Sequence, residues 1–403
     1  MGKLALISLI SDQPIPNVMA VLQREQTEQC FTHLEFIVSA DKNDPSRYDR
    51  RFDEICQRIE SFFAKRGYSI SRQPPVDPYN IQATLKAFQK AIEALKQQDY
   101  EVVFNITGGT KLMSLAAYFC TRYNGLEAIY VESRDRFLIS LSPVSDLNDA
   151  LAIEQIDTER KSLREDAFRV IDVPSYIALY GREINSSITV NDLPQDQIHK
   201  AQIIVQYYAT LRSRLSYLQN EITQAFKRNL ISWPFQLELK RRPTQLEREA
   251  LECFHINGIL SWDSAQAILS CGKEQAGFLK GKWIEVYVLN ELSSRNVFHD
   301  VRGDVTIKGW DGQCDVILTV NAQLAIIECK SEAKLSEQFG KIRALQRDRG
   351  GLYGRSFFIR SGETKTVILR AAEFYGIDQV IDAEELPRLA EIVAQHMGIS
   401  ASK

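Results

Sequence analysis

Residues 1–148 alternate short apolar runs with segments in which apolar residues recur at helical spacing. Leu4–Ile10 and His33–Val38 are runs of strand length, and Pro16 opens a helical segment between them. After the second run, a helical pattern passes through Ile59 and ends near Gly67. Such alternation is typical of a mostly parallel sheet with helices on both faces.

The pattern continues to the end of this region. We predict further strands and helices, in chain order, at Tyr68–Ser71, Ile81–Leu95, Tyr100–Asn105, Lys111–Tyr123, Glu127–Glu132 and Phe137–Leu141, the last two as a closing hairpin. Sheets of this kind bind ligands at the carboxyl ends of their strands. The sequence therefore predicts an α/β fold with a Rossmann-like, ligand-binding N-terminal domain over residues 1–148.

The rest of the chain divides into two parts. Residues 149–275 carry long helical stretches, notably Ile198–Phe226, broken by prolines, and we expect a helical connector or small accessory domain, with a winged-helix-like module as one option. Residues 276–403 show a helix over Phe278–Arg295, three strands, a helix from Leu335 to Asp348, the strand Ser356–Arg360, and a final strand and helix. We expect a compact α/β domain there.

Composition fits this division. The 403 residues exceed what one hydrophobic core normally supports, and 44% hydrophobic with 25% charged residues is ordinary for a globular protein. No segment reaches the roughly 18 consecutive apolar residues of a membrane span. The N-terminus has no signal-peptide pattern, and the seven cysteines form no CxxC pair. We expect a cytoplasmic protein that has no membrane partner and keeps its thiols reduced.

The net charge of −3 argues against bulk attraction to nucleic acid, so any such contact must be local. Two basic clusters are candidates for phosphate contact, although basic runs are usually solvated faces. The first contains Lys341, Arg343, Arg347, Arg349 and Arg355, and the second contains Lys240, Arg241 and Arg242.

Charged residues cluster around one predicted hairpin in the last domain. If its turn centres on Asn321-Ala322, antiparallel pairing places Asp315 directly opposite Glu328. Lys330 lies two residues after Glu328, so strand alternation places both side chains on one face and Cys329 on the other. Two acids and an ammonium group are therefore predicted to converge.

Opposed carboxylates destabilise a strand pair unless a cation lies between them. We hypothesise that Asp315 and Glu328 hold a divalent cation, Mg²⁺ or Mn²⁺, while Lys330 orients water or stabilises the transition state of phosphodiester hydrolysis. Glu285, in the preceding helix, is a candidate further ligand for the metal or its water. The alternative is an ion-pair cluster on an edge strand, against which Ala325–Ile327 has the composition of an interior strand.

A glycine-containing loop joins a buried strand to a helix in the first domain. Two glycines permit close backbone approach, and a helix N-terminus favours anions. The loop after the first strand should reach the same sheet edge. The alternative is a glycine turn without a ligand. The glycine loop contains Thr107, Gly108, Gly109, Thr110 and Lys111, and the loop after the first strand contains Ser11, Asp12 and Gln13.

Cys314-Asp315-Val316 followed by Ile326-Ile327-Glu328-Cys329-Lys330 resembles the core of PD-(D/E)xK nucleases, in which an Asp and a Glu-x-Lys hold a divalent metal. The amino-acid sequences of Gly281–Val288 and Arg349–Arg355 resemble, more specifically, those of the CRISPR-associated ancillary nucleases activated by cyclic oligoadenylate. In that family, the helix acid corresponding to Glu285 belongs to the active site. The Pro of the motif name is missing, and Cys314 replaces a commonly apolar or acidic neighbour.

The amino-acid sequence of residues 105–114 resembles that of the CRISPR-associated Rossmann-fold sensor domain, abbreviated CARF. The two resemblances together imply a homodimer that binds one cyclic oligoadenylate, with cyclic tetra-adenylate expected, across its sensor domains through the loop residues above. Binding would then switch a nuclease that cleaves RNA, DNA or both in type III CRISPR antiviral defence.

Two other functions stay open. One is a ligand-sensing, DNA-binding transcriptional regulator without nuclease activity, whose DNA-binding module would lie in residues 150–275. The other is a restriction or repair nuclease without ligand control. The Asp315, Glu328 and Lys330 set argues against the first, and the glycine loop argues against the second.

Overall fold

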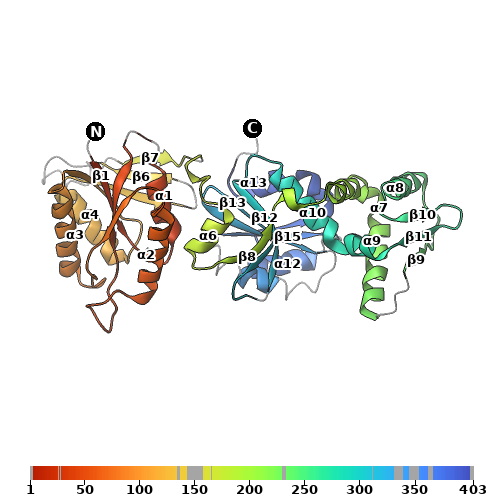
Figure 1. The fold of residues 1–403 in the computed structure, drawn as a ribbon, viewed down its shortest axis with the longest axis horizontal. Helices are drawn as coiled ribbons and strands as arrows, with labels where there is room; N and C mark the ends of the chain where they lie inside the picture. Colours follow the sequence, from red (N-terminus) through yellow and green to blue (C-terminus); the bar gives the residue numbers. More distant parts are fainter. Residues whose placement is uncertain are drawn as a thin grey trace. The chain divides into compact units, whose positions relative to one another are not determined.

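The computed structural model describes residues 3–25, 27, 29–133, 137–142, 158–164, 166–228, 233–310, 312–330, 339–344, 354–361 and 366–399. The chain forms two compact units, one made mainly of Met1–Glu183 and the other of Ile184–Gly350 with Gly354–Lys403 (Figure 1). Among the described residues, no helix is both long enough and apolar enough to span a membrane.

The first unit is built on a seven-stranded sheet with the order β3-β2-β1-β4-β5-β6-β7. The first five strands in this order are parallel, and β6 and β7 are antiparallel additions. The strands are β1 (Lys3–Leu9), β2 (Phe31–Ile37), β3 (Ser69–Arg72), β4 (Tyr100–Asn105), β5 (Glu127–Glu132), β6 (Phe137–Leu141) and β7 (Thr158–Ser162). The predicted strands and the closing hairpin are confirmed.

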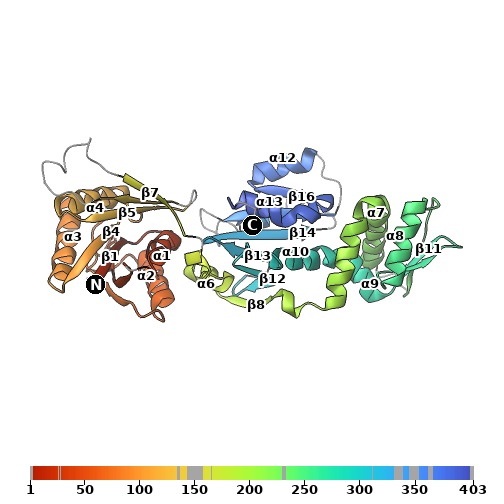
Figure 2. The ribbon, with the colours of Figure 1, turned by 90° about the horizontal axis from the view of Figure 1, so that it is seen from above.

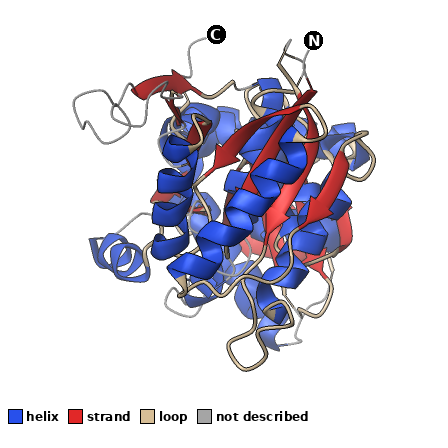
Figure 3. Ribbon diagram, turned by 90° about the vertical axis from the view of Figure 1, so that its left-hand side faces the viewer, coloured by secondary structure: helices blue, strands red, loops and turns tan. Residues whose placement is uncertain are grey.

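Helices cover both faces of this sheet, as Figure 3 shows from the side of this unit. Packing against one face, α3 and α4 share a core with odd-numbered residues of β1, such as Ile7. On the other face lie α1 and α2 (Figure 1). Their bounds are α1 (Pro14–Leu22), α2 (Arg50–Phe63), α3 (Ile81–Lys96) and α4 (Lys111–Tyr123), and the short α6 (Val173–Leu179) packs on α2. Helix α1 begins two residues before the predicted start, because its N-cap is Gln13 and Pro14 takes a first-turn position that needs no N–H donor.

Chain order reverses between β1 and β4, which are neighbours in the sheet although β2 and β3 come between them in sequence. Doubly wound sheets bind ligands at such a switch point, beyond the carboxyl ends of the strands. The register pairs Ser8 with Asn105, so β1 and β4 end side by side. The loops that follow them are therefore neighbours, as predicted.

The second unit contains a six-stranded sheet with the order β16-β15-β14-β13-β12-β8. Strands β12, β13 and β14 form an antiparallel meander, β15 and β16 continue it in parallel, and β8 pairs with β12 at the edge (Figure 2). The strands are β8 (Ile184–Ile188), β12 (Asp300–Ile307), β13 (Gln313–Val320), β14 (Gln323–Lys330), β15 (Arg355–Arg360) and β16 (Gln379–Asp382).

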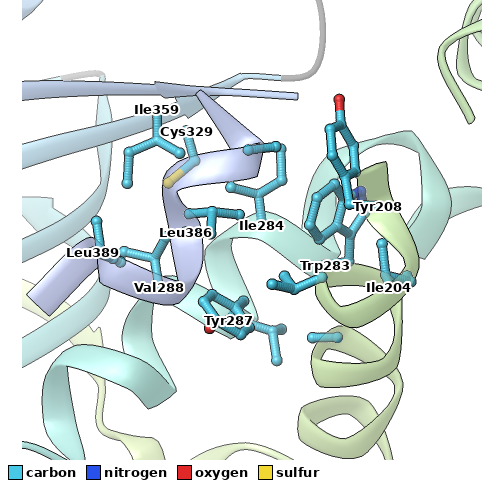
Figure 4. Close-up of a cluster of buried hydrophobic side chains, with 14 of the residues drawn as sticks. Ile204, Tyr208, Trp283, Ile284, Tyr287, Val288, Cys329, Ile359, Leu386 and Leu389 are labelled. Carbon is cyan, nitrogen blue, oxygen red and sulfur yellow. The ribbon is translucent and has the colours of Figure 1, made fainter. Parts of the chain in front are cut away.

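Helices also cover both faces of this second sheet (Figure 1). Helices α10 (Trp283–Ser293) and α13 (Leu389–His396) lie on one face, and α12 (Thr366–Tyr375), which the sequence pattern missed, lies on the other. Figure 4 shows the core where α10 meets this face: Trp283, Ile284 and Val288 pack among Tyr208, Cys329 and Leu386. Tyr208 comes from α7 (Gln195–Arg228), which includes the predicted helical stretch.

A small three-stranded sheet lies between α7 and α10 in sequence. It has the order β10-β11-β9 and packs with α8 (Gln245–Ile256). The strands are β9 (Phe235–Glu238), β10 (Ser261–Asp263) and β11 (Ile268–Cys271), and the short α9 (Lys273–Gly277) follows. The segment predicted as a helical connector therefore also contains strands, and its winged-helix character stays a prediction.

Candidate active site and ligand site

The β13–β14 hairpin brings three of the predicted catalytic residues together. Pairs such as Val316 with Ile327 and Val320 with Gln323 fix the register, and Asp315 and Glu328 are the residues that directly adjoin the first of these pairs. The turn at residues 321 and 322 has positive φ at both positions, as a two-residue hairpin turn requires. The register predicted from the sequence is confirmed.

Lys330 connects the two carboxylates. Its Nζ lies 2.6 Å from Glu328 Oε1 and 3.1 Å from Asp315 Oδ2. The backbone N–H of Cys329 also donates to Asp315 Oδ2 at 2.7 Å, which fixes the orientation of that carboxylate. Asp315 is 7% exposed and Glu328 is 8% exposed. An edge-strand ion-pair cluster would be open to water, so the burial contradicts that alternative.

Burial dominates the electrostatics of this cluster. It raises the pKa of Glu328 to about 7, with the negative charge of Asp315 adding to the effect and the contact with Lys330 opposing it. Burial likewise raises the pKa of Asp315. Burial lowers the pKa of Lys330, but the two carboxylates raise it more, so the ammonium form is favoured. One ammonium group does not fully compensate two buried carboxylates, and the site favours a further cation.

Glu285, the fourth predicted residue, lies in the first turn of α10. Burial and the charge of Asp315 raise its pKa, so it is within electrostatic range of the cluster. Its carboxylate, however, binds Lys282, whose Nζ lies 2.8 Å from Glu285 Oε2. The same Nζ lies 2.9 Å from Asp304 Oδ2. Sequence reasoning missed Lys282 and Asp304, because only tertiary structure brings β12 beside the start of α10.

The residues present suit a hard divalent cation. Buried carboxylate oxygens with an excess of negative charge are the donors that Mg²⁺ and Mn²⁺ prefer. Among the described residues, however, no three His, Cys, Asp or Glu side chains converge closely enough to form a complete ligand set. Asp315 and Glu328 lie together and Glu285 lies nearby, so a metal site at these carboxylates stays a prediction.

The glycine loop of the first unit packs against the end of β1. A Cβ atom at Gly108 would lie 1.9 Å from the carbonyl oxygen of Leu9, so only glycine fits there. Gly109 has a φ of +75°, which also favours glycine. Thr110 caps α4 by accepting the N–H of Met113 at 3.2 Å, and Lys111 is the first helical residue. The loop thus directs a helix N-terminus to the switch point.

Neighbouring side chains hold both loops of this candidate ligand site. The Thr107 hydroxyl donates to Asn105 Oδ1 at 2.6 Å and accepts the N–H of Val131 at 2.8 Å. The amide of Asn105 donates to Asn17 at 2.9 Å, and Asn17 donates to the carbonyl of Leu9. Sequence reasoning did not assign this buried asparagine pair, which ties the end of β4 to α1.

The loop after β1 contains the other predicted contacts. Ser11 and Gln13 contact each other, with Ser11 Oγ 3.4 Å from the Gln13 backbone N and O. Asp12 pairs with Arg51 at 2.6 Å, which offsets its negative charge. The Tyr180 hydroxyl donates to Gln13 Oε1 at 3.0 Å. Arg51 and Tyr180 were not predicted, and no local sequence signal marks them.

The basic clusters gain less support. In the first, Arg343 donates to the Gly376 carbonyl and Arg355 pairs with Asp378 at 2.9 Å, while Arg347 and Arg349 lie outside the described residues. In the second, Arg241 pairs with Glu247 at 3.0 Å. These arginines are at least partly engaged within the protein, so phosphate contact by either cluster stays a prediction.

Comparison with protein families agrees with this geometry. Residues 5–156 match the Card1 CARF domain, and residues 272–399 match the Card1-like endonuclease domain. The chain is therefore of the class that joins a CARF sensor domain to an endonuclease domain. More narrowly, its two domains belong to the Card1 CARF and Card1-like endonuclease families. The predicted recognition and fold class are confirmed.

Solved structures share the fold over the whole chain. Protein VC1899 from Vibrio cholerae is 20% identical and matches with a TM-score of 0.71 over 98% of both chains. Can2 from Sulfobacillus thermosulfidooxidans, solved in complex with cyclic tetra-adenylate, is 18% identical and matches with a TM-score of 0.70 over 98% of this chain and 97% of its own. A type III CRISPR defence DNA nuclease activated by cyclic oligoadenylate is 15% identical, with a TM-score of 0.50 over 89% of this chain and 45% of its own.

A search among curated proteins gives no significant match.

The raised pKa of Glu328 predicts a pH-dependent stability of the metal-free protein. A free glutamate ionises near pH 4.5 and Glu328 near pH 7, so between these values the unfolded state loses protons that the folded state keeps. The contribution of Glu328 to the free energy of unfolding is therefore greatest below pH 4.5, and this contribution falls by up to about 3 kcal/mol by pH 7. Urea unfolding followed by tryptophan fluorescence measures it, since all four tryptophans follow Ile184.

Glu328→Gln is the matched variant for this measurement, because glutamine does not titrate. We expect it to flatten the decline between pH 4.5 and 7, and we expect Mn²⁺ to stabilise the wild type more at pH 8 than at pH 5. An equal decline in both proteins would show that Glu328 does not carry the effect.

Proposed function

We propose that this protein is a metal-dependent endonuclease, activated by cyclic oligoadenylate, that cleaves RNA, DNA or both in type III CRISPR antiviral defence. Its CARF and endonuclease domains support a nuclease under ligand control. The observation that carries the catalytic assignment is the buried pair Asp315 and Glu328, bridged by Lys330 within the endonuclease domain.

Each catalytic residue has a role that its contacts support. Asp315 and Glu328 would hold a divalent cation, with Glu285 as a further ligand of the metal or its water. The cation, when bound, would lower the pKa of a water and neutralise charge on the phosphate. Lys330 keeps its positive charge between the carboxylates and would orient the attacking water or stabilise the charge that develops on the phosphoryl oxygens. This arrangement is that of a PD-(D/E)xK nuclease.

The CARF unit supplies the proposed ligand site. The loop of Gly108 and Gly109, the N-terminus of α4 with Lys111, and the loop of Gln13 meet at the switch point of the sheet. Glycine backbone that permits close approach and a helix N-terminus suit phosphate groups. The fold shared with Can2, which was solved with cyclic tetra-adenylate, favours that ligand.

Helix α4 supports the proposed homodimer. Four of its large apolar side chains are exposed at spacings of three or four residues, so they form one stripe along the helix, and the stripe begins beside Lys111. Pairing two such stripes around a twofold axis would bring two ligand loops together, as a symmetric ligand requires. The stripe consists of Leu112, Leu115, Phe119 and Tyr123.

One hydrogen bond supports coupling between ligand and nuclease. Tyr180, which binds Gln13, is the C-cap of α6, and three residues separate it from β8. Strand β8 is the edge strand of the nuclease sheet and pairs with β12. A ligand that draws Gln13 away from Tyr180 would change the constraint on a strand of the nuclease domain through a very short link.

The competing function, a DNA-binding regulator without nuclease activity, gains little support. Its DNA-binding module would lie around α8, whose exposed face mixes Arg248 with Glu249 and Glu252. A regulator would also have no use for two opposed, buried carboxylates. Metal-independent binding to a specific DNA site, without cleavage, would favour it.

Lys330→Ala and Glu328→Gln test the active site. We expect each to lower the cleavage rate by about 100-fold or more with Mn²⁺ and cyclic tetra-adenylate. Lys330→Ala removes a cation that would stabilise the transition state, and Glu328→Gln removes a carboxylate that would hold the metal. The assay uses labelled single-stranded RNA, single-stranded DNA and supercoiled plasmid. Calorimetry should show unchanged ligand affinity in both variants, and the exposed Lys273→Ala should cleave normally. Normal cleavage by both active-site variants would disprove the assignment.

Phe119→Asp tests the dimer. Placing a charge in the middle of the stripe should yield a monomer that binds ligand weakly, because each chain would then supply only half of the site. Light scattering after size exclusion measures the mass, and calorimetry should give one ligand per two wild-type chains. Phe374→Asp, which alters an 84% exposed aromatic on α12, serves as the control and should remain dimeric.

Tyr180→Phe tests the coupling. Without the hydroxyl, ligand binding no longer has to break the hydrogen bond from Tyr180 to Gln13. We therefore expect ligand affinity to rise about fivefold, the equivalent of about 1 kcal/mol, and ligand-free cleavage to increase. Tyr217→Phe, whose ring lies beneath Lys240, is a matched control without such an effect. Unchanged affinity and unchanged basal cleavage would rule out Tyr180 as a link.

A further inference from the structure

Lys282 lies between two acidic side chains next to the proposed metal site. Its Nζ is 2.8 Å from Glu285 Oε2 and lies 3.0 Å and 2.9 Å from the two carboxylate oxygens of Asp304. All three side chains are partly buried, and Lys282 is the most exposed at 37%. The ammonium group thus binds the carboxylate proposed as the third metal ligand, and Asp304 binds that ammonium from its other side.

The fold sets both ends of this contact. Lys282 ends a π-helical turn, Phe278–Lys282, in which Gly281 departs from helical geometry just before α10 begins. Asp304 has a φ of +50°, and the β12–β13 register places it opposite Asp315. Gln313 donates to Asp304 Oδ1 at 2.6 Å and helps to hold its carboxylate. Both residues are therefore fixed by backbone features at the active-site end of the sheet.

Charge counting explains why this contact concerns the cation. In their ionised forms the four acids carry four negative charges, and Lys282 and Lys330 supply two positive charges, so two negative charges remain uncompensated. One divalent cation would neutralise them. To ligate that cation, however, Glu285 must loosen its contact with Lys282, because the cation and the Lys282 ammonium group compete for the Glu285 carboxylate. The acids are Glu285, Asp304, Asp315 and Glu328.

We propose that Lys282 and Asp304 are positioning residues that control the availability of Glu285 to the metal. Lys282 is an internal counter-ion that competes with the cation for Glu285, and Asp304 draws the ammonium away from it. This inference rests on the proposed function of Asp315 and Glu328 as the metal core. The opposing roles predict opposite effects when each residue is neutralised, whereas a merely structural ion pair would weaken the site in both cases.

Mn²⁺ affinity of the full-length protein, measured by calorimetry without nucleic acid, tests the proposal. Lys282→Gln removes the competing ammonium group and should tighten Mn²⁺ binding about fivefold. Asp304→Asn removes the second carboxylate that binds Lys282, so Lys282 should bind Glu285 more strongly and Mn²⁺ binding should weaken about fivefold. In a Glu285→Gln background, Lys282→Gln should have no effect, because the contested carboxylate is gone. Arg295→Gln, which breaks an exposed ion pair at the end of α10, should not change the affinity.

The outcomes separate this inference from the proposed function. If the wild type binds Mn²⁺ and Glu328→Gln weakens binding, the metal core is supported. In that case, equal or same-direction effects of Lys282→Gln and Asp304→Asn would overturn the roles proposed for them. If the wild type binds no Mn²⁺ and cleaves no nucleic acid, the metal core and this inference both fail.

Discussion

Two carboxylates that face each other across an interior strand pair impose the main constraint on the nuclease domain. Asp315 and Glu328 are buried, and one ammonium group from Lys330 lies between them. Burying like charges is unfavourable, so the surrounding fold must provide the free energy that holds them there. The raised pKa of Glu328 reflects this cost. The ion pairs of this site alone therefore do not balance its charge.

The apolar face of the same sheet provides that support. Cys329 of β14 packs into the core with Ile284 and Val288 of α10 (Figure 4). Because side chains alternate along β14, its neighbours Glu328 and Lys330 lie on the other face, where they form part of the charged cluster. The packing that buries α10 also places Glu285 in its first turn near the cluster. Helix α10 thus contributes to the core along most of its length and places Glu285 near the cluster at its start.

The main constraint on the sensor unit is the close approach of two backbone segments, the glycine loop and the end of β1. Gly108 lies so near the Leu9 carbonyl that any side chain would collide with it, and buried Asn17 and Asn105 fasten the neighbouring segments. This packing leaves the N-terminus of α4 at the sheet edge, where α/β folds bind ligands. The short covalent path from Tyr180 to β8 then offers a way for that edge to influence a strand of the nuclease sheet.

Sequence alone determined the features that depend on local periodicity. Strand alternation and a two-residue turn fix which residues face each other in one hairpin, so the register of β13 with β14 followed from counting, and with it the convergence of Asp315, Glu328 and Lys330. Tertiary structure decided the rest: Lys282 with Asp304, and Tyr180 with Gln13, join elements far apart in sequence. Such contacts depend on how helices and strands pack and on where a backbone distortion directs a side chain, and no short stretch of sequence encodes either.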